Sequence, residues 1–232
     1  MTTFSETANR AEPKTQTSRK GPLAGLRVID AGNMIAGPLA ATQMADFGAD
    51  VIKLELPGSG DSMRHWTPMK EGLSLWWKVI ARNKRLITLT LSNPRGQELF
   101  RELVREADVL IENYRPGTFE RWGLGYEELA RINPRLVMVR VSGFGQTGPY
   151  AKRGGYGTIA EAFSGIPSFT GAPDRPPTLP GFPMADSVAS TFAAMAAMFA
   201  VYNRDHGGGR GQEIDVSLYE PLFRLVESQV IG

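Results

Sequence analysis

The sequence contains no cysteine and has two histidines, His65 and His206, among its 232 residues. The absence of thiols excludes disulfides, thiolate metal sites and a cysteine nucleophile. Two histidines are too few for a histidine-rich zinc site and argue against a histidine-based catalytic triad. We therefore expect no metal site, and chemistry that depends on carboxylates, hydroxyls, amides, lysine or arginine.

The sequence also lacks a large excess of one charge, because 26 Lys and Arg against 24 Asp and Glu leave a net charge of +2. This balance argues against a nucleic-acid partner. Apolar residues make up 42% and charged residues 22%, which excludes a disordered or fibrous protein. Residues 1–20 carry almost nothing apolar and no secretory signal, so they predict a disordered leader. Residues 21–232 then predict one large domain of a protein from a reducing compartment, the cytoplasm.

Short apolar runs alternate with helical patterns from residue 21 onward. A helix is expected near Pro38 and another over 93–107, where Leu99, Phe100, Leu103 and Val104 share one face. The predicted strands are 26–30, 50–56, 86–91, 109–111 and 136–141. Strands separated by helices indicate parallel βαβ units, so we predict an α/β fold with a Rossmann-like open parallel sheet and flanking helices.

The second part of the chain has a different pattern. Residues 143–182 are rich in glycine and proline and predict a loop, whereas residues 187–203 carry no charge. That uncharged segment touches the lower limit of about 17–25 residues for a membrane span. Because Ala, Ser and Thr dominate it, and Asp186 and Arg204 flank it, we expect a helix buried in a soluble domain and no membrane association. Residues 222–232 predict a further helix, which the chain end interrupts, so we expect a truncated protein.

A G-x-G-x-x-G pattern, GFGQTG, follows a predicted strand at residues 143–148. In a Rossmann site such glycines bring backbone amides to a pyrophosphate at a helix start. Residues 149–155 do not begin an apolar-periodic helix, and no acidic residue closes a second strand about twenty positions later. The pattern therefore predicts a glycine-rich turn and not a dinucleotide site.

Asp186 is the only acidic residue between Asp174 and Asp205, and it lies where the uncharged helix begins. Its spacing fits an N-cap, since a carboxylate there accepts backbone N–H bonds. It also fits a nucleophile at the mouth of an apolar segment. The amides of the helix start would keep the carboxylate ionised and would stabilise a developing oxyanion. Both roles remain open from the sequence.

Several loops fit an anionic, adenine-bearing ligand. Residues 83–85 (NKR) place two cations before a strand, and residues 112–117 (ENYRPG) place an amide, an aromatic ring and an arginine after one. Arg121 follows about one helical turn later, and residues 34–38 form a loop after the first strand. Each feature alone fits a solvated cation or a turn; together they match the loops beyond strand ends where open α/β sheets bind ligands.

At these residues the sequence resembles the class III CoA-transferases of the formyl-CoA and carnitine type, a family that includes α-methylacyl-CoA racemase. The resemblance runs from Gly21 to the end and is carried by residues 36–38, 47–53, 58–61, 83–85, 112–117, 122–126, 143–149, 186 and 209–212. Residues 140–149 and 219–224 look most like the succinyl-CoA:L-malate CoA-transferases.

The resemblance implies a Rossmann-like large domain, a smaller domain that is missing here, and two interlocked chains. We therefore expect an N-terminal portion that forms a homodimer or a related-subunit dimer when full length. Asp186 aligns with the catalytic aspartate of the family. The positions that align with the wall holding CoA are Met34, Ile35, Ala36, Leu89, Asn113, Tyr114 and Arg121. CoA itself is a substrate, so no bound cofactor is expected.

This chain departs from the family pattern at several positions. In the family a cation often follows the Glu55 position, and this chain has Leu56 there. Ile35 replaces a residue that is sometimes polar, and Gly157 stands where many relatives carry an acid. Tyr156 occupies the position of the histidine base in the racemase branch, and tyrosine is a poor proton acceptor near neutral pH.

The implied function is transfer of CoA from an acyl-CoA to a carboxylic acid. Asp186 would form a mixed anhydride and then an aspartyl-CoA thioester, with neither ATP nor a metal. The alternatives are racemisation at the α-carbon of an acyl-CoA, and an inactive fragment that binds CoA or dimerises. The sequence does not name the acyl donor or the acceptor.

Overall fold

The computed structural model describes residues 20–231, so the leader predicted over residues 1–20 lies almost wholly outside the described residues. The strands are β1 (Arg27–Asp30), β2 (Asp50–Glu55), β3 (Met69–Lys70), β4 (Leu73–Ser74), β5 (Lys84–Thr88), β6 (Val109–Glu112), β7 (Val137–Ser142) and β8 (Glu213–Ser217). The α-helices are α1 (Ala36–Asp46), α2 (Leu75–Ala81), α3 (Pro94–Arg105), α4 (Thr118–Arg121), α5 (Tyr126–Ile132), α6 (Gly157–Ser164), α7 (Met184–His206) and α8 (Glu220–Ile231). Two short 3₁₀ helices are η1 (Ser62–His65) and η2 (Ile166–Phe169).

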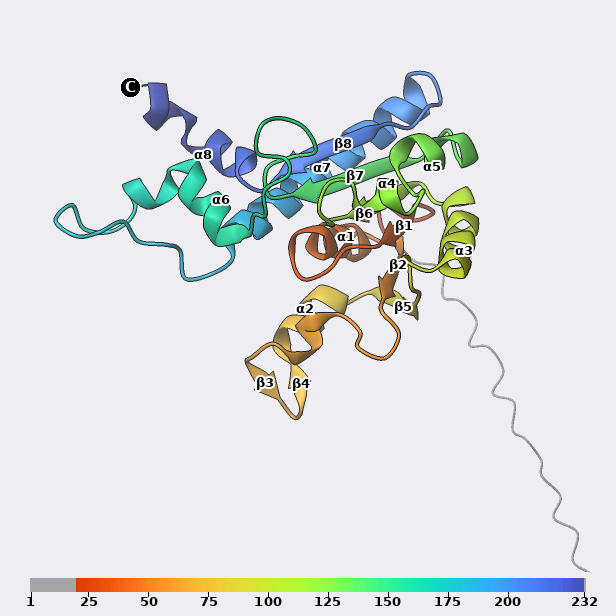
Figure 1. Cartoon of the computed structure of the whole chain (residues 1–232), viewed down its shortest axis with the longest axis horizontal. Coiled ribbons are helices and arrows are strands. Elements are labelled where there is room, and N and C mark those ends of the chain that lie inside the picture. Colours follow the sequence, from red (N-terminus) through yellow and green to blue (C-terminus); the bar gives the residue numbers. More distant parts are fainter. Residues whose placement is uncertain (1–19, 232) are drawn as a thin grey trace, which may run out of the picture.

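Six strands form one parallel sheet in the order β5-β2-β1-β6-β7-β8, which confirms the predicted α/β fold (Figure 1). The first strand of the sheet is β1. The chain then adds β2 and β5 on one side of β1 and returns to add β6, β7 and β8 on the other side. Val28 of β1 pairs with Val51 of β2 and Val109 of β6, and all three are fully buried. The winding direction reverses between β1 and β6, where the loops after these strands diverge and leave a crevice at their carboxyl ends.

Helices cover both faces of the sheet. On one face α1 packs against α7, and the buried positions of both helices are mostly alanine, so their backbones approach closely. On the other face α3, α4 and α5 bury larger side chains, among them Phe100, Phe119 and Leu129. The central strands β2, β1, β6 and β7 are buried on both sides, as is typical of parallel sheets, whereas the edge strands β5 and β8 are partly exposed. These two layers fix where the loops beyond the strands emerge.

The predicted strand over 86–91 is wrong in its bounds, because β5 pairs with β2 from Lys84 to Thr88. Leu89 and Leu91 continue the apolar pattern but pack with the α3 layer after the strand has ended. Their hydrophobicity reports burial and not pairing. Lys84 and Arg85 therefore lie inside the strand and at the opposite end of it from the ligand-binding edge.

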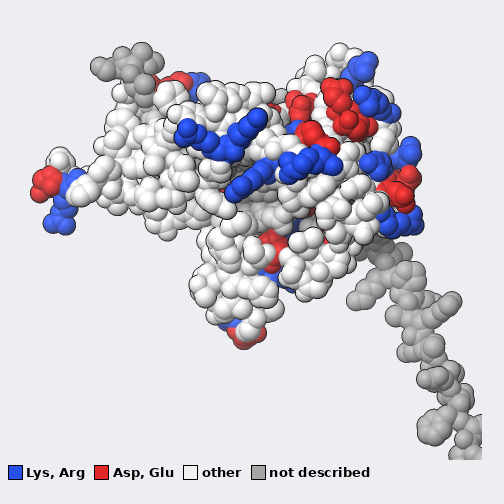
Figure 2. Space-filling model, in the orientation of Figure 1, with Lys and Arg blue, Asp and Glu red and all other residues white. Residues whose placement is uncertain are grey.

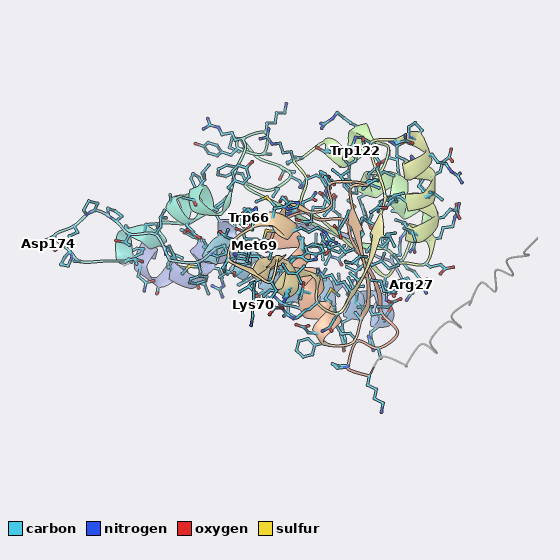
Figure 3. All side chains as sticks on the ribbon, turned by 90° about the horizontal axis from the view of Figure 1, so that it is seen from below. Arg27, Trp66, Met69, Lys70, Trp122 and Asp174 are labelled. Atoms are coloured by element: carbon cyan, nitrogen blue, oxygen red, sulfur yellow. The ribbon has the colours of Figure 1, made fainter. Side chains whose placement is uncertain are left out.

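Several elements carry no prediction from the sequence. Within the predicted loop 143–182 lie α6 and η2. No strand is predicted over β8, although its residues alternate between apolar and polar. The hairpin β3–β4 and α2 project away from the sheet (Figure 1). Asp174 lies at the tip of the long loop after η2, far from Trp122 and Arg27 (Figure 3).

The uncharged segment forms α7, as predicted, but the helix is longer and only one of its faces is buried. Phe199 and Tyr202 are 65% and 67% exposed because α7 lies in the outer layer of the fold. The prediction of a buried helix is therefore wrong for this outer face. By length and hydropathy, α7 is the one helix within residues 20–231 that would suffice to cross a membrane. Its inner face packs against α1 and β7 in this structure.

Candidate active site

A cavity of about 590 Å³ lies at the carboxyl edge of the sheet, beside the point where the winding reverses. It is lined by the loop after β1, the residue after β6, the end of β7, the start of α6 and the loop before α7. The lining includes the aromatic side chains Trp66, Trp76, Tyr156 and Phe182. Its acids are Glu161 and Asp186, and no Lys, Arg or His lines it within the described chain. A mostly apolar cavity with two carboxyl groups is a typical setting for a reactive carboxylate.

Asp186 is the third residue of α7 and lines this cavity. The N-cap is Pro183, so the N-cap interpretation of Asp186 is wrong. Burial, together with the negative charge of Glu161, raises the pKa of Asp186 to about 6. A backbone hydrogen bond acts in the opposite direction and lowers the pKa, as the sequence predicts for a helix start, but burial outweighs it. Above pH 6 the side chain is nevertheless mostly carboxylate.

Helix α6 approaches Asp186 through two residues on one face, Gly157 and Glu161, which are four positions apart. A Cβ atom on Gly157 would lie 2.5 Å from Oδ2 of Asp186, so the absence of a side chain makes room for the carboxylate. Glu161 is buried, and its Oε1 accepts a hydrogen bond from the backbone N–H of Ala185 at 3.2 Å. Sequence reasoning missed Glu161 because the helix that carries it lies in a stretch read as loop.

Replacing Gly157 with alanine is expected to lower any activity that depends on Asp186 by about tenfold or more. The new methyl group would meet Oδ2 closer than real Cβ contacts allow and would rotate the carboxylate out of place. Steady-state rates of Gly157→Ala and of Gly181→Ala measure this effect, since a Cβ at Gly181 meets nothing within 4 Å. Equal rates for the two variants would contradict the steric role of Gly157.

The loop between β1 and α1 forms the opposite wall of the cavity. Asn33 and Asn113 bind each other across the reversal point: the N–H of Asn33 donates to Oδ1 of Asn113 at 2.7 Å, and Nδ2 of Asn113 donates to the Asn33 carbonyl at 2.8 Å. Met34 takes a positive φ of 61°, which is uncommon for a residue with a side chain. Its N–H donates to Oδ1 of Asp61 at 3.4 Å. This bonding holds the loop backbone in a fixed shape.

Five of the eight predicted site residues line the one cavity, namely Asp186, Met34, Ile35, Ala36 and Asn113. The other three, Leu89, Tyr114 and Arg121, do not line it.

Leu89 lines a separate groove between β5 and α3, together with Leu99. Tyr114 packs on Trp122, with ring centroids 5.2 Å apart. Arg121 is exposed and donates to Thr118 Oγ1 at 3.0 Å.

A buried ionic network lies beneath the β1–α1 loop. The Nζ of Lys53 is 3.0 Å from Oδ2 of Asp61 and donates to the Gly32 carbonyl at 2.9 Å. The Nζ of Lys84 contacts Oδ2 of Asp30 at 2.7 Å. Burial opposes ionisation of Asp30, but the charges of Lys53 and Lys84 lower its pKa, whereas burial lowers the pKa of Lys84 to about 8.

The network corrects one ligand prediction from the sequence. Lys84 faces the core and not a ligand, and Arg85 pairs with Asp50 at 2.5 Å. Neither residue of the predicted cation pair is therefore placed to contact a phosphate at the cavity.

The glycine pattern at 143–148 forms a loop, as predicted, and does not begin a helix. Gly143 packs on Gly155 so closely that a Cβ on Gly143 would lie 2.7 Å from the Cα of Gly155. The N–H of Gln146 donates to Oδ2 of Asp215 at 2.7 Å. This loop amide is therefore bound by a carboxylate of the protein itself.

Exposed cations gather beside the cavity, over the loops that follow β6 and β7 (Figure 2). The exposed cations of these loops and of α4 are Arg115, Arg121, Lys152 and Arg153. The guanidinium of Arg153 lies 4.4 Å from the ring centre of Tyr150, and Arg115 lies next to Gly154. None of the four cations forms an ion pair within residues 20–231, so the group is open to an anionic ligand. Across the same residues, no three His, Asp or Glu side chains are placed to hold a metal ion.

The geometry can be compared with known proteins. The sequence profile described as CoA-transferase family III matches residues 23–232. The chain belongs to CoA-transferase family III. This result confirms the resemblance that the sequence motifs carry.

One similar protein is a succinyl-CoA–D-citramalate CoA-transferase of Chloroflexus aurantiacus. It is 51% identical to this chain over 210 residues, and the match covers 90% of this chain and 52% of the relative. The beta subunit of a succinyl-CoA–L-malate CoA-transferase from the same organism is 47% identical over 211 residues, with coverage of 90% and 52%. The crystal structure of a CaiB/BaiF family protein from Brucella suis is 39% identical, with a TM-score of 0.86, and covers 91% of this chain and 57% of that one. The chain thus spans about half the length of these family III proteins.

Proposed function

We propose that this chain provides the nucleophile and the CoA-binding surface of a CoA-transferase, which moves CoA from an acyl-CoA to a carboxylic acid. The observation that carries the proposal is the carboxylate of Asp186, which lines a cavity at the reversal point of a family III fold. A carboxylate suits this reaction because its acyl derivatives are themselves reactive. The two relatives from Chloroflexus aurantiacus are named as succinyl-CoA-dependent CoA-transferases, so succinyl-CoA is the first donor to test.

The reaction proceeds in two halves. A carboxylate oxygen of Asp186 attacks the thioester carbonyl, the C–S bond breaks, and CoA leaves as the thiolate, so that a mixed anhydride remains. The thiolate then attacks the anhydride at the Asp186 carbonyl and releases the donor acid as its carboxylate, which leaves an aspartyl-CoA thioester. An acceptor carboxylate reverses both steps and restores Asp186. One thioester replaces another, so the cycle needs neither ATP nor a metal.

The raised pKa of Asp186 supports its role as the nucleophile. A carboxylate of higher pKa is a stronger nucleophile, and with a pKa of about 6 the group is still mostly ionised at neutral pH. In the racemase alternative a base must take the α-proton. The residue at the corresponding position is Tyr156, which is 64% exposed and, as a tyrosine, is a poor proton acceptor near neutral pH. We therefore favour transfer over racemisation.

The charges in and around the cavity indicate separate binding regions for the phosphates and the pantetheine arm of CoA. The cavity lining carries acids but no cation in the described chain, so the phosphates of CoA do not belong inside it. Four cations lie outside the lining. Arg115 and Arg153 are each two positions from a lining residue, Asn113 and Gly155 respectively, and the other two are Arg121 and Lys152. We place the phosphates against these cations and the pantetheine arm along the loop of residues 33–36, with CoA acting as a substrate and not as a bound cofactor. A second chain, identical or related, completes the site in this proposal.

The test is to trap the acylated aspartate. We expect incubation with succinyl-CoA and hydroxylamine to convert Asp186 to its hydroxamate, which peptide mass spectrometry detects. Free CoA in place of succinyl-CoA is the control and should give no adduct. Turnover without any label on Asp186 would contradict the proposal. CoA binding without label or turnover would support an inactive binding fragment, and deuterium uptake at the α-carbon without an acceptor would support racemisation.

A further inference from the structure

We propose that Glu161 is a positioning residue for Asp186. The charge of Glu161 destabilises the free carboxylate of Asp186, and the hydrogen bond between Glu161 and Ala185 fixes the first turn of α7. The inference rests on the proposed function, because it assigns the nucleophile to Asp186. It adds a second acid to the site and gives that acid a task that differs from nucleophilic attack.

The geometry begins with α6. Gly157 and Glu161 lie one helical turn apart on the face of α6 that meets the start of α7, and Glu161 is 4% exposed. Gly157 lets Asp186 Oδ2 approach the α6 backbone, so the carboxylate is held beside the helix that carries the second acid. Both acids line the same cavity. Two buried carboxylates in one apolar cavity repel each other more strongly than they would in water.

The hydrogen bond to Ala185 fixes this arrangement. Oε1 of Glu161 accepts the N–H of Ala185, which is the residue directly before Asp186 in the first turn of α7. That N–H has no partner within the helix, since the first amides of a helix point out of its end. Glu161 therefore ties α6 to the backbone that carries the nucleophile, and its own carboxyl cannot move away from Asp186 without losing this bond.

Other groups around Asp186 do not offset the charge of Glu161. From α6 the facing residues are Gly157 and Glu161, and from the N-cap of α6 it is the exposed Tyr156. The loop before α7 contributes Leu179, Pro180, Phe182 and Pro183, none of which titrates. The walls formed by the loop after β1 and by the end of β7 add no charged side chain to the lining. Among the described residues, the charge that acts on Asp186 is thus the like charge of Glu161.

This repulsion changes during the reaction. When Asp186 attacks the thioester, its negative charge passes to the departing sulfur, and residue 186 becomes a neutral anhydride or thioester. The repulsion from Glu161 then disappears at residue 186. Glu161 thereby raises the energy of the free carboxylate relative to the acylated side chain, which favours attack.

The experiment compares Glu161→Gln with the wild-type protein and with Asp174→Asn, an exposed acid at the tip of the long loop (Figure 3). Glutamine keeps the size and the acceptor oxygen for Ala185 but removes the charge. We expect the acid limb of the pH–rate profile, measured with succinyl-CoA and an acceptor acid, to move down by about one pH unit. The plateau rate should fall by about three- to tenfold. Asp174→Asn should leave both unchanged.

A second measurement does not depend on turnover. In protein labelled with ¹³C at the aspartate carboxyls, the Asp186 signal, assigned by its loss in Asp186→Asn, should titrate about one pH unit lower in Glu161→Gln. An unchanged titration of Asp186 in Glu161→Gln would overturn the inference. If Asp186→Asn retained full transfer, the proposed function would fail instead, so the two failures are distinguishable. A Glu161→Leu variant with lower stability and an unshifted Asp186 titration would assign Glu161 a purely structural role.

Discussion

Replacing Asp186 with asparagine is expected to lower CoA transfer by at least about a thousandfold. The amide keeps the size of the side chain beside Gly157 but cannot attack a thioester and regenerate itself. Initial rates of acyl-CoA consumption with a carboxylic acid acceptor measure the loss. Retention of more than a few per cent of the wild-type rate would contradict the assignment of Asp186 as the nucleophile.

The same variant has a stability signature that separates a lost nucleophile from a lost fold. Because folding raises the pKa of Asp186 from its ordinary value of 3.8 to about 6, its ionisation lowers the stability of the native state as the pH rises through that range. Asparagine removes this cost. Asp186→Asn should therefore unfold at the same or a higher temperature than the wild-type protein above pH 6, and the advantage should vanish near pH 4. In the wild-type protein, activity should rise with pH through about 6, since the carboxylate is the reactive form.

Replacing Lys53 with methionine is expected to lower the free energy of unfolding by about 3–5 kcal/mol. The side chain is fully buried between Asp30 and Asp61, and methionine fills a similar volume without the charge. Lys84 still compensates Asp30, but Asp61 would keep an uncompensated buried charge. Urea unfolding of Lys53→Met and of Lys78→Met, whose lysine is exposed on α2, measures the difference.

A double variant tests the cause of that loss. Lys53→Met combined with Asp61→Asn removes both charges, so it should recover part of the stability that Lys53→Met loses. The single variant should also weaken CoA binding, since Lys53 holds the Gly32 carbonyl and Asp61 holds the amide of Met34. If Lys53→Met lost no more stability and no more CoA affinity than Lys78→Met, the ionic network would not support the β1–α1 loop.

The architecture was predictable because its signal is local. The central strands are short apolar runs, and a strand buried on both faces can carry little else. The helix over 93–107 was predictable from one apolar stripe, and Phe100 and Val104 of that stripe are fully buried. The α/β fold followed from the order of these patterns along the chain. β5 was misplaced because Leu91 is buried and Leu89 is half-buried beyond Thr88, the last paired residue of the strand, and apolarity alone does not separate burial from strand pairing.

The candidate site was predictable in part, for a different reason. Met34 and Asn113 follow strands, and the carboxyl ends of parallel strands share one edge of a sheet. Asp186 was conspicuous as the single acid of a long uncharged stretch. Lys84 was misread because a cation next to a strand looks the same in a sequence whether it faces solvent or a buried aspartate.

The sequence by itself determined the central strands of the sheet, the helix over 93–107 and the acid at the head of α7, because each is encoded in neighbouring residues. The tertiary structure alone decided the environment of that acid. Gly157 and Glu161 reach Asp186 from another helix across more than twenty positions of chain, and burial between the two helices raises the pKa of the carboxyl. Solvation and charge at a site depend on which segments meet there, and that is a property of packing and not of local sequence.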